Sequence, residues 1–160
     1  MASPALRRYP PISHPARWLI VGFISGAVAV LFFHQGVLAI LYSLGAAPRA
    51  PFSMQATGPL GIPQVWSLAF WGGVWGLALA ISLRRWDGPA LVASATLFGA
   101  IVPTLVAWFV VAPLKHQPVA AGFVLSAMAV GLLVNAAWGL GTGIGLNLFG
   151  RPHLRALRTI

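Results

Sequence analysis

Four long stretches of apolar residues, separated by short polar segments, dominate the chain. The first covers residues 18–42, reads WLIVGFISGAVAVLFFHQGVLAILY and contains no Asp, Glu, Lys or Arg. At a rise of about 1.5 Å per residue, a helix of this length crosses a hydrocarbon core of about 30 Å. An uncharged run this long would be hard to explain in a soluble domain, so the pattern predicts a transmembrane helix.

Three further apolar stretches predict three more transmembrane helices, at residues 64–83, 89–111 and 118–149. The last is longer than one crossing requires, so we expect it to tilt, to emerge from the membrane or to break. Glycine occupies every second position from Gly139 to Gly145, which makes this run the expected site of irregular structure or close packing. The predicted fold is all-α, an integral membrane bundle of four transmembrane helices within residues 18–149.

The segments outside the spans indicate how the chain is oriented. Residues 1–17 are polar and broken by prolines, and we expect them to lie disordered or on the membrane surface. Residues 150–160 form a basic tail that suits anionic lipid. These two segments and the connection after the second span carry eight basic residues, whereas the other loops carry only Arg49 and Lys115. The positive-inside rule therefore predicts that both termini are cytoplasmic.

Composition narrows the class of protein further. Of the 160 residues, 59% are hydrophobic and 7% are charged, whereas about 25% are charged in a typical soluble domain. The absence of cysteine excludes disulfides and thiolate-bound metals. Asp87 is the one acidic residue, and a catalytic mechanism that needs two carboxylates is therefore not expected. The basic residues that give the net charge of +9 lie at the ends of apolar segments. This placement favours contact with anionic lipid headgroups over binding of nucleic acid. We therefore expect a lipid-embedded protein with no enzyme activity, cofactor or metal.

Small residues at helical spacing predict close contacts between helices. In the second span, Gly72, Gly73 and Gly76 fall on one side, and such a stripe lets the backbone of another helix approach closely. A bulky replacement, Gly76→Leu, should therefore destabilise the fold or its assembly. The full set of predicted helix-packing residues is Gly22, Gly26, Gly72, Gly73, Gly76, Gly139 and Gly143.

His34, Gln35 and Asn135 are the candidate functional residues, because polar side chains inside a span often face the bundle interior and mark function. Two interpretations stay open. Either these side chains join helices by hydrogen bonds, which average about 0.6 kcal/mol in membrane proteins, or they form an intramembrane site for a solute. The sequence offers Asn135, Thr104 or a carbonyl freed by Pro103 as partners for the imidazole of His34.

Redox cofactors give a further set of hypotheses. A haem needs two axial ligands, and His116, just outside the third span, is the histidine that could join His34 on the same side of the membrane. A quinone could be bound by His34 together with Trp108. Nothing in the spacing brings either pair together, so both hypotheses rank below helix packing.

The segments FFHQGVLA, PQVWSLAFWGGVWG and VAWFVVAPLKHQP together resemble uncharacterised small four-helix inner-membrane proteins of proteobacteria. The resemblance extends over nearly the whole chain and implies their fold, but it brings no activity and no site residues. Nine of the ten basic residues are arginine, a bias that suits a GC-rich bacterial genome.

Three hypotheses for function follow. The first is a small non-catalytic protein of the bacterial inner membrane, an accessory or assembly subunit that packs against itself or a larger membrane complex. The second is an oligomeric transporter or channel for a small solute. The third is a redox subunit that binds haem or quinone.

Overall fold

The computed structural model describes residues 14–150, so the predicted tail and most of the N-terminal segment lie outside the described residues. The described chain is mostly helical. It contains four helices that are long and apolar enough to cross a membrane, Pro15–Ser43, Gln64–Ser82, Gly88–Leu114 and Leu125–Phe149. The prediction of four helices that are long and apolar enough to cross a membrane is thereby confirmed.

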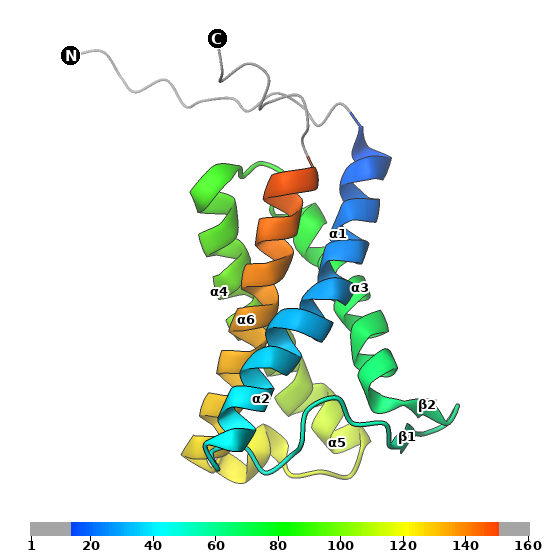
Figure 1. The fold of residues 1–160 in the computed structure, drawn as a ribbon, viewed down its shortest axis with the longest axis vertical. Helices are drawn as coiled ribbons and strands as arrows, with labels where there is room; N and C mark the ends of the chain where they lie inside the picture. Colours follow the sequence, from blue (N-terminus) through cyan, green and yellow to red (C-terminus); the bar gives the residue numbers. More distant parts are fainter. Residues whose placement is uncertain (1–13, 151–160) are drawn as a thin grey trace, which may run out of the picture.

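The first and third spans are each built from several helical segments (Figure 1). The first consists of α1 (Pro15–Ala29), a π-helical turn η1 (Val30–His34) and α2 (Gln35–Ser43). The third consists of α4 (Gly88–Val106), a second π-helical turn η2 (Ala107–Val111) and α5 (Ala112–Leu114). The second and fourth spans are α3 (Gln64–Ser82) and α6 (Leu125–Phe149). The loop between α2 and α3 contains a small hairpin of β1 (Ala56–Thr57) and β2 (Ile62–Pro63).

The π turn η1 changes which face of the first span is buried. Gly22, Gly26 and Val30 are buried at intervals of four residues, but the next buried residue along this face is Gln35, five positions after Val30. The backbone N–H of Gln35 bonds to the carbonyl of Val30, the i→i+5 pattern of a π-helix. One extra residue in the turn therefore brings Gln35, and not His34, to the most buried position.

The start of the fourth span differs from the prediction. It begins at Leu125 and not at residue 118, because the preceding 3-10 turn η3 (Val119–Phe123) is not right-handed. Ala120, Ala121 and Gly122 have φ of 48°, 55° and 69°, in the left-handed region, which a continuing α-helix cannot contain. By contrast, α6 stays helical from Gly139 to Gly145, so of the two alternatives for the glycine run the structure shows close packing and not irregular structure.

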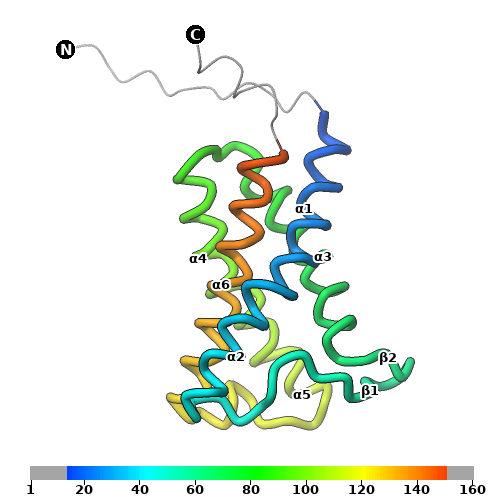
Figure 2. Tube along the Cα trace, in the orientation of Figure 1, coloured from blue at the N-terminus to red at the C-terminus, as the bar shows by residue number. Residues whose placement is uncertain are grey.

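The helices pack in a spatial order that differs from their order along the chain. α6 packs against α4 on one side and against α1 on the other, and α1 packs against α3. α3 and α4 meet at few positions, among them the rings of Trp75 and Phe98, whose centroids lie 6.4 Å apart. The start of α1, the end of α6 and the turn between α3 and α4 lie at one end of the bundle (Figure 2). We call the opposite end, with the β hairpin and α5, the loop end.

Candidate functional site

Gln35 is the most buried of the three predicted polar residues. Its side chain is only 2% exposed, and its Oε1 accepts a hydrogen bond of 2.7 Å from the backbone N–H of Phe52. Its Nε2 lies 3.5 Å from Nδ1 of His34, which is half-buried. His34 and Gln35 therefore form one polar pair, and Gln35 supplies its bond to the rest of the protein.

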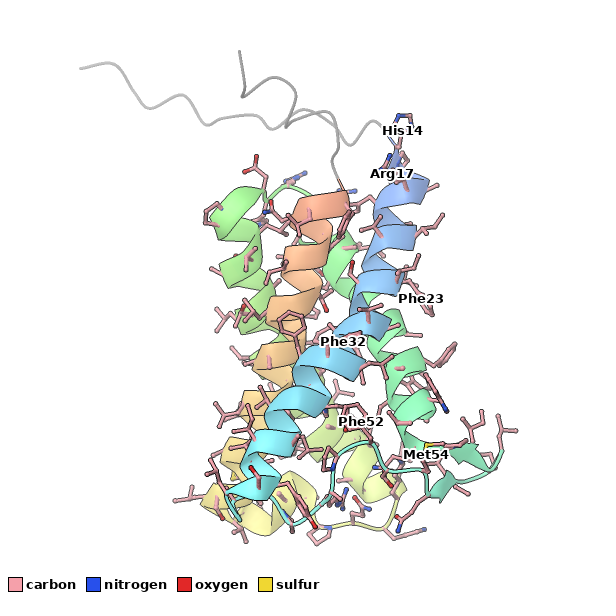
Figure 3. The ribbon with its side chains drawn as sticks, viewed as in Figure 1. His14, Arg17, Phe23, Phe32, Phe52 and Met54 are labelled. Carbon is pink, nitrogen blue, oxygen red and sulfur yellow. The ribbon has the colours of Figure 1, made fainter. Side chains whose placement is uncertain are left out.

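The bond from Phe52 ties the long loop to the first span. Phe52 lies in the part of the loop that crosses the loop end of the bundle on its way to β1 (Figure 3), and its backbone has φ of 52°. Immediately after it, the carbonyl of Ser53 accepts a bond of 3.1 Å from the N–H of Val65, the second residue of α3. Two adjacent loop residues thus connect the first span to the second at the loop end.

Asn135 makes a separate hydrogen bond on the other side of α6. Its Nδ2 donates to Oγ1 of the buried Thr104 across 2.9 Å, which links α6 to α4. Asn135 and Thr104 were two of the three possible partners for His34, but they bond to each other instead. Asn135 faces α4, whereas His34 and Gln35 lie at the turn between α1 and α2. The structure therefore does not bring the three predicted polar residues into one site.

Two buried tryptophans contribute polar links that the sequence analysis did not identify. Nε1 of Trp138 in α6 donates to the carbonyl of Gly26 in α1 across 2.9 Å. Nε1 of Trp18 donates to the carbonyl of Ala80 in α3 across 2.7 Å. A buried indole N–H needs an acceptor. The presence of tryptophans within or beside glycine-rich spans was therefore the feature of the sequence that could have predicted these two contacts.

The predicted packing glycines of the first two spans lie at the contact between α1 and α3. A Cβ on Gly22 would lie 2.7 Å from Cβ of Ala80 and 2.9 Å from the carbonyl oxygen of Gly76. A Cβ on Gly26 would lie 3.0 Å from Cα of Gly76. Gly72 also makes room for the indole of Trp138. The backbones of α1 and α3 therefore touch directly along this contact.

The glycines of α6 serve two neighbouring helices. Gly139 faces Ala95 and Gly99 of α4, and a Cβ there would lie 3.1 Å from Cα of Gly99. Gly143 faces Ala95 as well, at 2.7 Å from its Cβ. The intervening Gly141 instead faces the ring of Phe33 on the first span. Alternating glycines thus let one helix approach α4 on one face and the first span on another.

His116 and Trp108, the two residues proposed to bind a redox cofactor together with His34, lie in different surroundings. His116 is exposed, follows α5 and has φ of 52°. Trp108 packs on α6 at Gly131 and makes an edge-to-face contact with Phe109, with ring centroids 6.5 Å apart. Within residues 14–150, no three His, Cys, Asp or Glu side chains come together as a metal site would require.

A shallow groove of about 680 Å³ runs along the outside of α4 and α6. Apolar and small side chains line it, including Val92, Leu97 and Leu140, with Asn147 at one end. Oδ1 of Asn147 accepts a bond of 3.1 Å from the N–H of Gly88, which ties the start of α4 to the end of α6. The groove contains none of the three predicted polar residues.

The chain matches no protein-family model, and no curated protein and no solved structure is significantly similar to it. The resemblance to small inner-membrane proteins of proteobacteria therefore stays a prediction. What the geometry offers chemically is a set of helix-joining hydrogen bonds and close backbone contacts.

Proposed function

We propose that this chain is a small non-catalytic protein of the bacterial inner membrane, an accessory or assembly subunit that packs against itself or a larger membrane complex. The observation that supports this proposal is the use of the intramembrane polar groups. Gln35 accepts from Phe52, Asn135 donates to Thr104, and Trp138 donates to a backbone carbonyl. Groups that hold the bundle together are not free to bind a substrate, so the outer surface is where a function can reside.

The outer surface of α3 has the character of a packing surface. Phe70 and Trp71 are 56% and 57% exposed, and their rings meet edge to face with centroids 5.7 Å apart. Phe23 of α1 extends the cluster, with its ring centroid 6.3 Å from that of Phe70. Large aromatic side chains dominate contacts between proteins because each offers a large apolar area and few rotamers.

A native mass measurement in mild detergent tests the proposal. We expect a homo-oligomer or a complex with a second membrane protein, in fixed stoichiometry. The variant Trp71→Ala should weaken this association, whereas Leu97→Ala, on the exposed side of α4, serves as the matched control. A strictly monomeric chain without a co-purifying membrane protein would contradict the proposal.

The orientation with both termini in the cytoplasm is part of the proposal. Arg84 and Arg85 lie at the same end of the bundle as the start of α1 and the end of α6, which agrees with the positive-inside rule. Reporter fusions at Ile160 and within residues 46–56 test this orientation. A periplasmic signal from the fusion at Ile160 would overturn it.

The other two hypotheses have direct tests of their own. A transporter needs free polar groups along a path, yet Gln35 and Asn135 are already hydrogen-bonded. Solute uptake into vesicles that contain the purified protein, lost in His34→Phe, would favour that hypothesis. A haem subunit would show a visible absorption band in the purified protein.

A further inference from the structure

The hairpin between the first two spans projects sideways from the bundle, beside the start of α3 (Figure 1). It consists of β1 and β2, whose residues pair antiparallel as Ala56 with Pro63 and Thr57 with Ile62. We call residues 56–63 the outer hairpin. Because β2 ends at Pro63 and α3 begins at Gln64, the hairpin is joined to the second span without an intervening residue.

Within the outer hairpin itself the exposed residues are apolar, whereas Gln55 just before it is polar and exposed. Leu60 at the tip is 78% exposed, Ile62 is 42% exposed, and Met54 just before the hairpin is 64% exposed. No Asp, Glu, Lys, Arg or His occurs between Pro51 and Leu83. A loop in water normally carries polar residues at such positions, so these side chains require an apolar neighbour.

Several polar groups of the outer hairpin are bonded within the loop. The hydroxyl of Thr57 donates to the carbonyl of Ile62 across 2.7 Å, and the N–H of Gly61 donates to the carbonyl of Thr57 across 2.9 Å. At its base, the N–H of Gln64 donates to the carbonyl of Gln55 across 2.9 Å. Internal bonding of backbone groups is what a segment needs before it can leave water for the edge of a bilayer.

The length of α3 fixes the depth of the hairpin. α3 has 19 residues, so at about 1.5 Å per residue it spans about 28 Å, which is no more than the hydrocarbon thickness. Both of its ends therefore lie at the membrane surfaces. Trp66, 53% exposed in the first turn of α3, agrees with this depth, because indoles favour the interface.

We propose that the outer hairpin lies in the interfacial layer of the membrane, with Leu60 and Ile62 inserted against lipid. The apolar surface of the hairpin continues directly into the exposed, apolar side of α3 at Trp66 and Phe70. This inference goes beyond the proposed function, since it depends on the spans crossing a membrane and on no protein partner.

The absence of cysteine from the chain makes the test direct, because each introduced cysteine is the only one. Three variants are labelled with a nitroxide and placed in vesicles of phosphatidylethanolamine and phosphatidylglycerol: Leu60→Cys at the hairpin tip, Ala50→Cys in the loop, and Phe32→Cys as a lipid-facing reference in the first span. All three positions are exposed, so labelling should leave the fold intact. Electron paramagnetic resonance then compares collisions with oxygen, which concentrates in lipid, and with a nickel chelate, which stays in water.

We expect the oxygen-to-nickel ratio at Leu60→Cys to be severalfold higher than at Ala50→Cys and lower than at Phe32→Cys, which lies deeper along its span. Equal ratios at Leu60→Cys and Ala50→Cys would overturn the proposal, because the tip would then be in water. Exclusion of both reagents with spin–spin broadening, relieved by dilution with unlabelled protein, would also overturn it by showing that hairpins of two copies pair. A low ratio at Phe32→Cys would overturn the membrane placement itself. None of these readings requires oligomerisation, so they are independent of the test of the proposed function.

Discussion

The direct contact between the backbones of α1 and α3 makes Gly76→Ala the most informative single change. A Cβ at this position would meet the carbonyl oxygen of Gly22, and it would lie 3.0 Å from the carbonyl carbon of Gly22 and 3.1 Å from Cα of Gly26. All three are backbone atoms of a helix, so no side-chain rotation can relieve the overlap. The two helices must move apart, and the neighbouring contacts of α1 with α3 loosen with them.

The magnitude follows from two opposed effects. Forcing an extra carbon into a close-packed contact costs about 1–3 kcal/mol. Replacing glycine by alanine within a helix otherwise gains up to about 1 kcal/mol, because alanine loses less backbone entropy on folding. Gly36 in α2 has no heavy atom within 4 Å of its Cβ position, so Gly36→Ala should show only the gain. The gain applies to both variants and cancels, so they should differ by about 1–3 kcal/mol in the free energy of unfolding.

Unfolding by sodium dodecyl sulfate in mild-detergent micelles, followed by circular dichroism, measures this difference. Gly73→Ala provides an intermediate case, because its Cβ would meet the ring of Phe23 at 2.7 Å and that ring can turn aside. We expect stability to fall in the order Gly36→Ala, Gly73→Ala, Gly76→Ala. Equal stability of Gly76→Ala and Gly36→Ala would refute the close contact between α1 and α3.

Three further predictions concern the polar links. Gln35→Leu removes the acceptor of the Phe52 N–H and should lower the free energy of unfolding by about 1–3 kcal/mol. It should also speed proteolysis of the loop after α2, and an unchanged cleavage rate would contradict this bond. Asn135→Leu and Thr104→Val, alone and combined, should give a coupling energy of about 0.6 kcal/mol in a double-mutant cycle, and strict additivity would show that the pair does not interact. His34→Phe should lower the free energy of unfolding by about 1 kcal/mol or less in the same assay, because the hydrogen bond that the structure gives the His34 ring is a long one, 3.5 Å from Gln35. A larger loss would assign His34 a further structural partner.

The sequence predicts the four spans well because the free energy of placing apolar side chains in lipid depends on composition, which is read directly from the chain. The contact of Gly22 and Gly26 with Gly72 and Gly76 was also accessible, since small residues four positions apart face one way on any helix. Both inferences need only the composition of a segment and the spacing of residues within it.

The features that escaped prediction depend on one backbone angle or one extra residue. The segment Val119–Phe123 is apolar like the helix after it, so composition does not reveal its left-handed turn. The π turn before Gln35 has no sequence marker, and its extra residue brings Gln35 to the most buried position in place of His34. The partner of Gln35 is a backbone N–H of Phe52, and side-chain identity cannot specify which loop amide will reach it.

The central position of α6 has a consequence for how the protein is made. α1 and α3 are synthesised first and can pair through their glycines as soon as both have left the ribosome. α4, in contrast, packs mainly on α6, which is translated last of the four, and α4 meets α3 at few positions. During synthesis, the small-residue face of α4 with Ala95 and Gly99 therefore stays without its partner until α6 is inserted. A chain interrupted before Leu125 would lack α6 and would therefore leave this small-residue face of α4 without the helix that covers it.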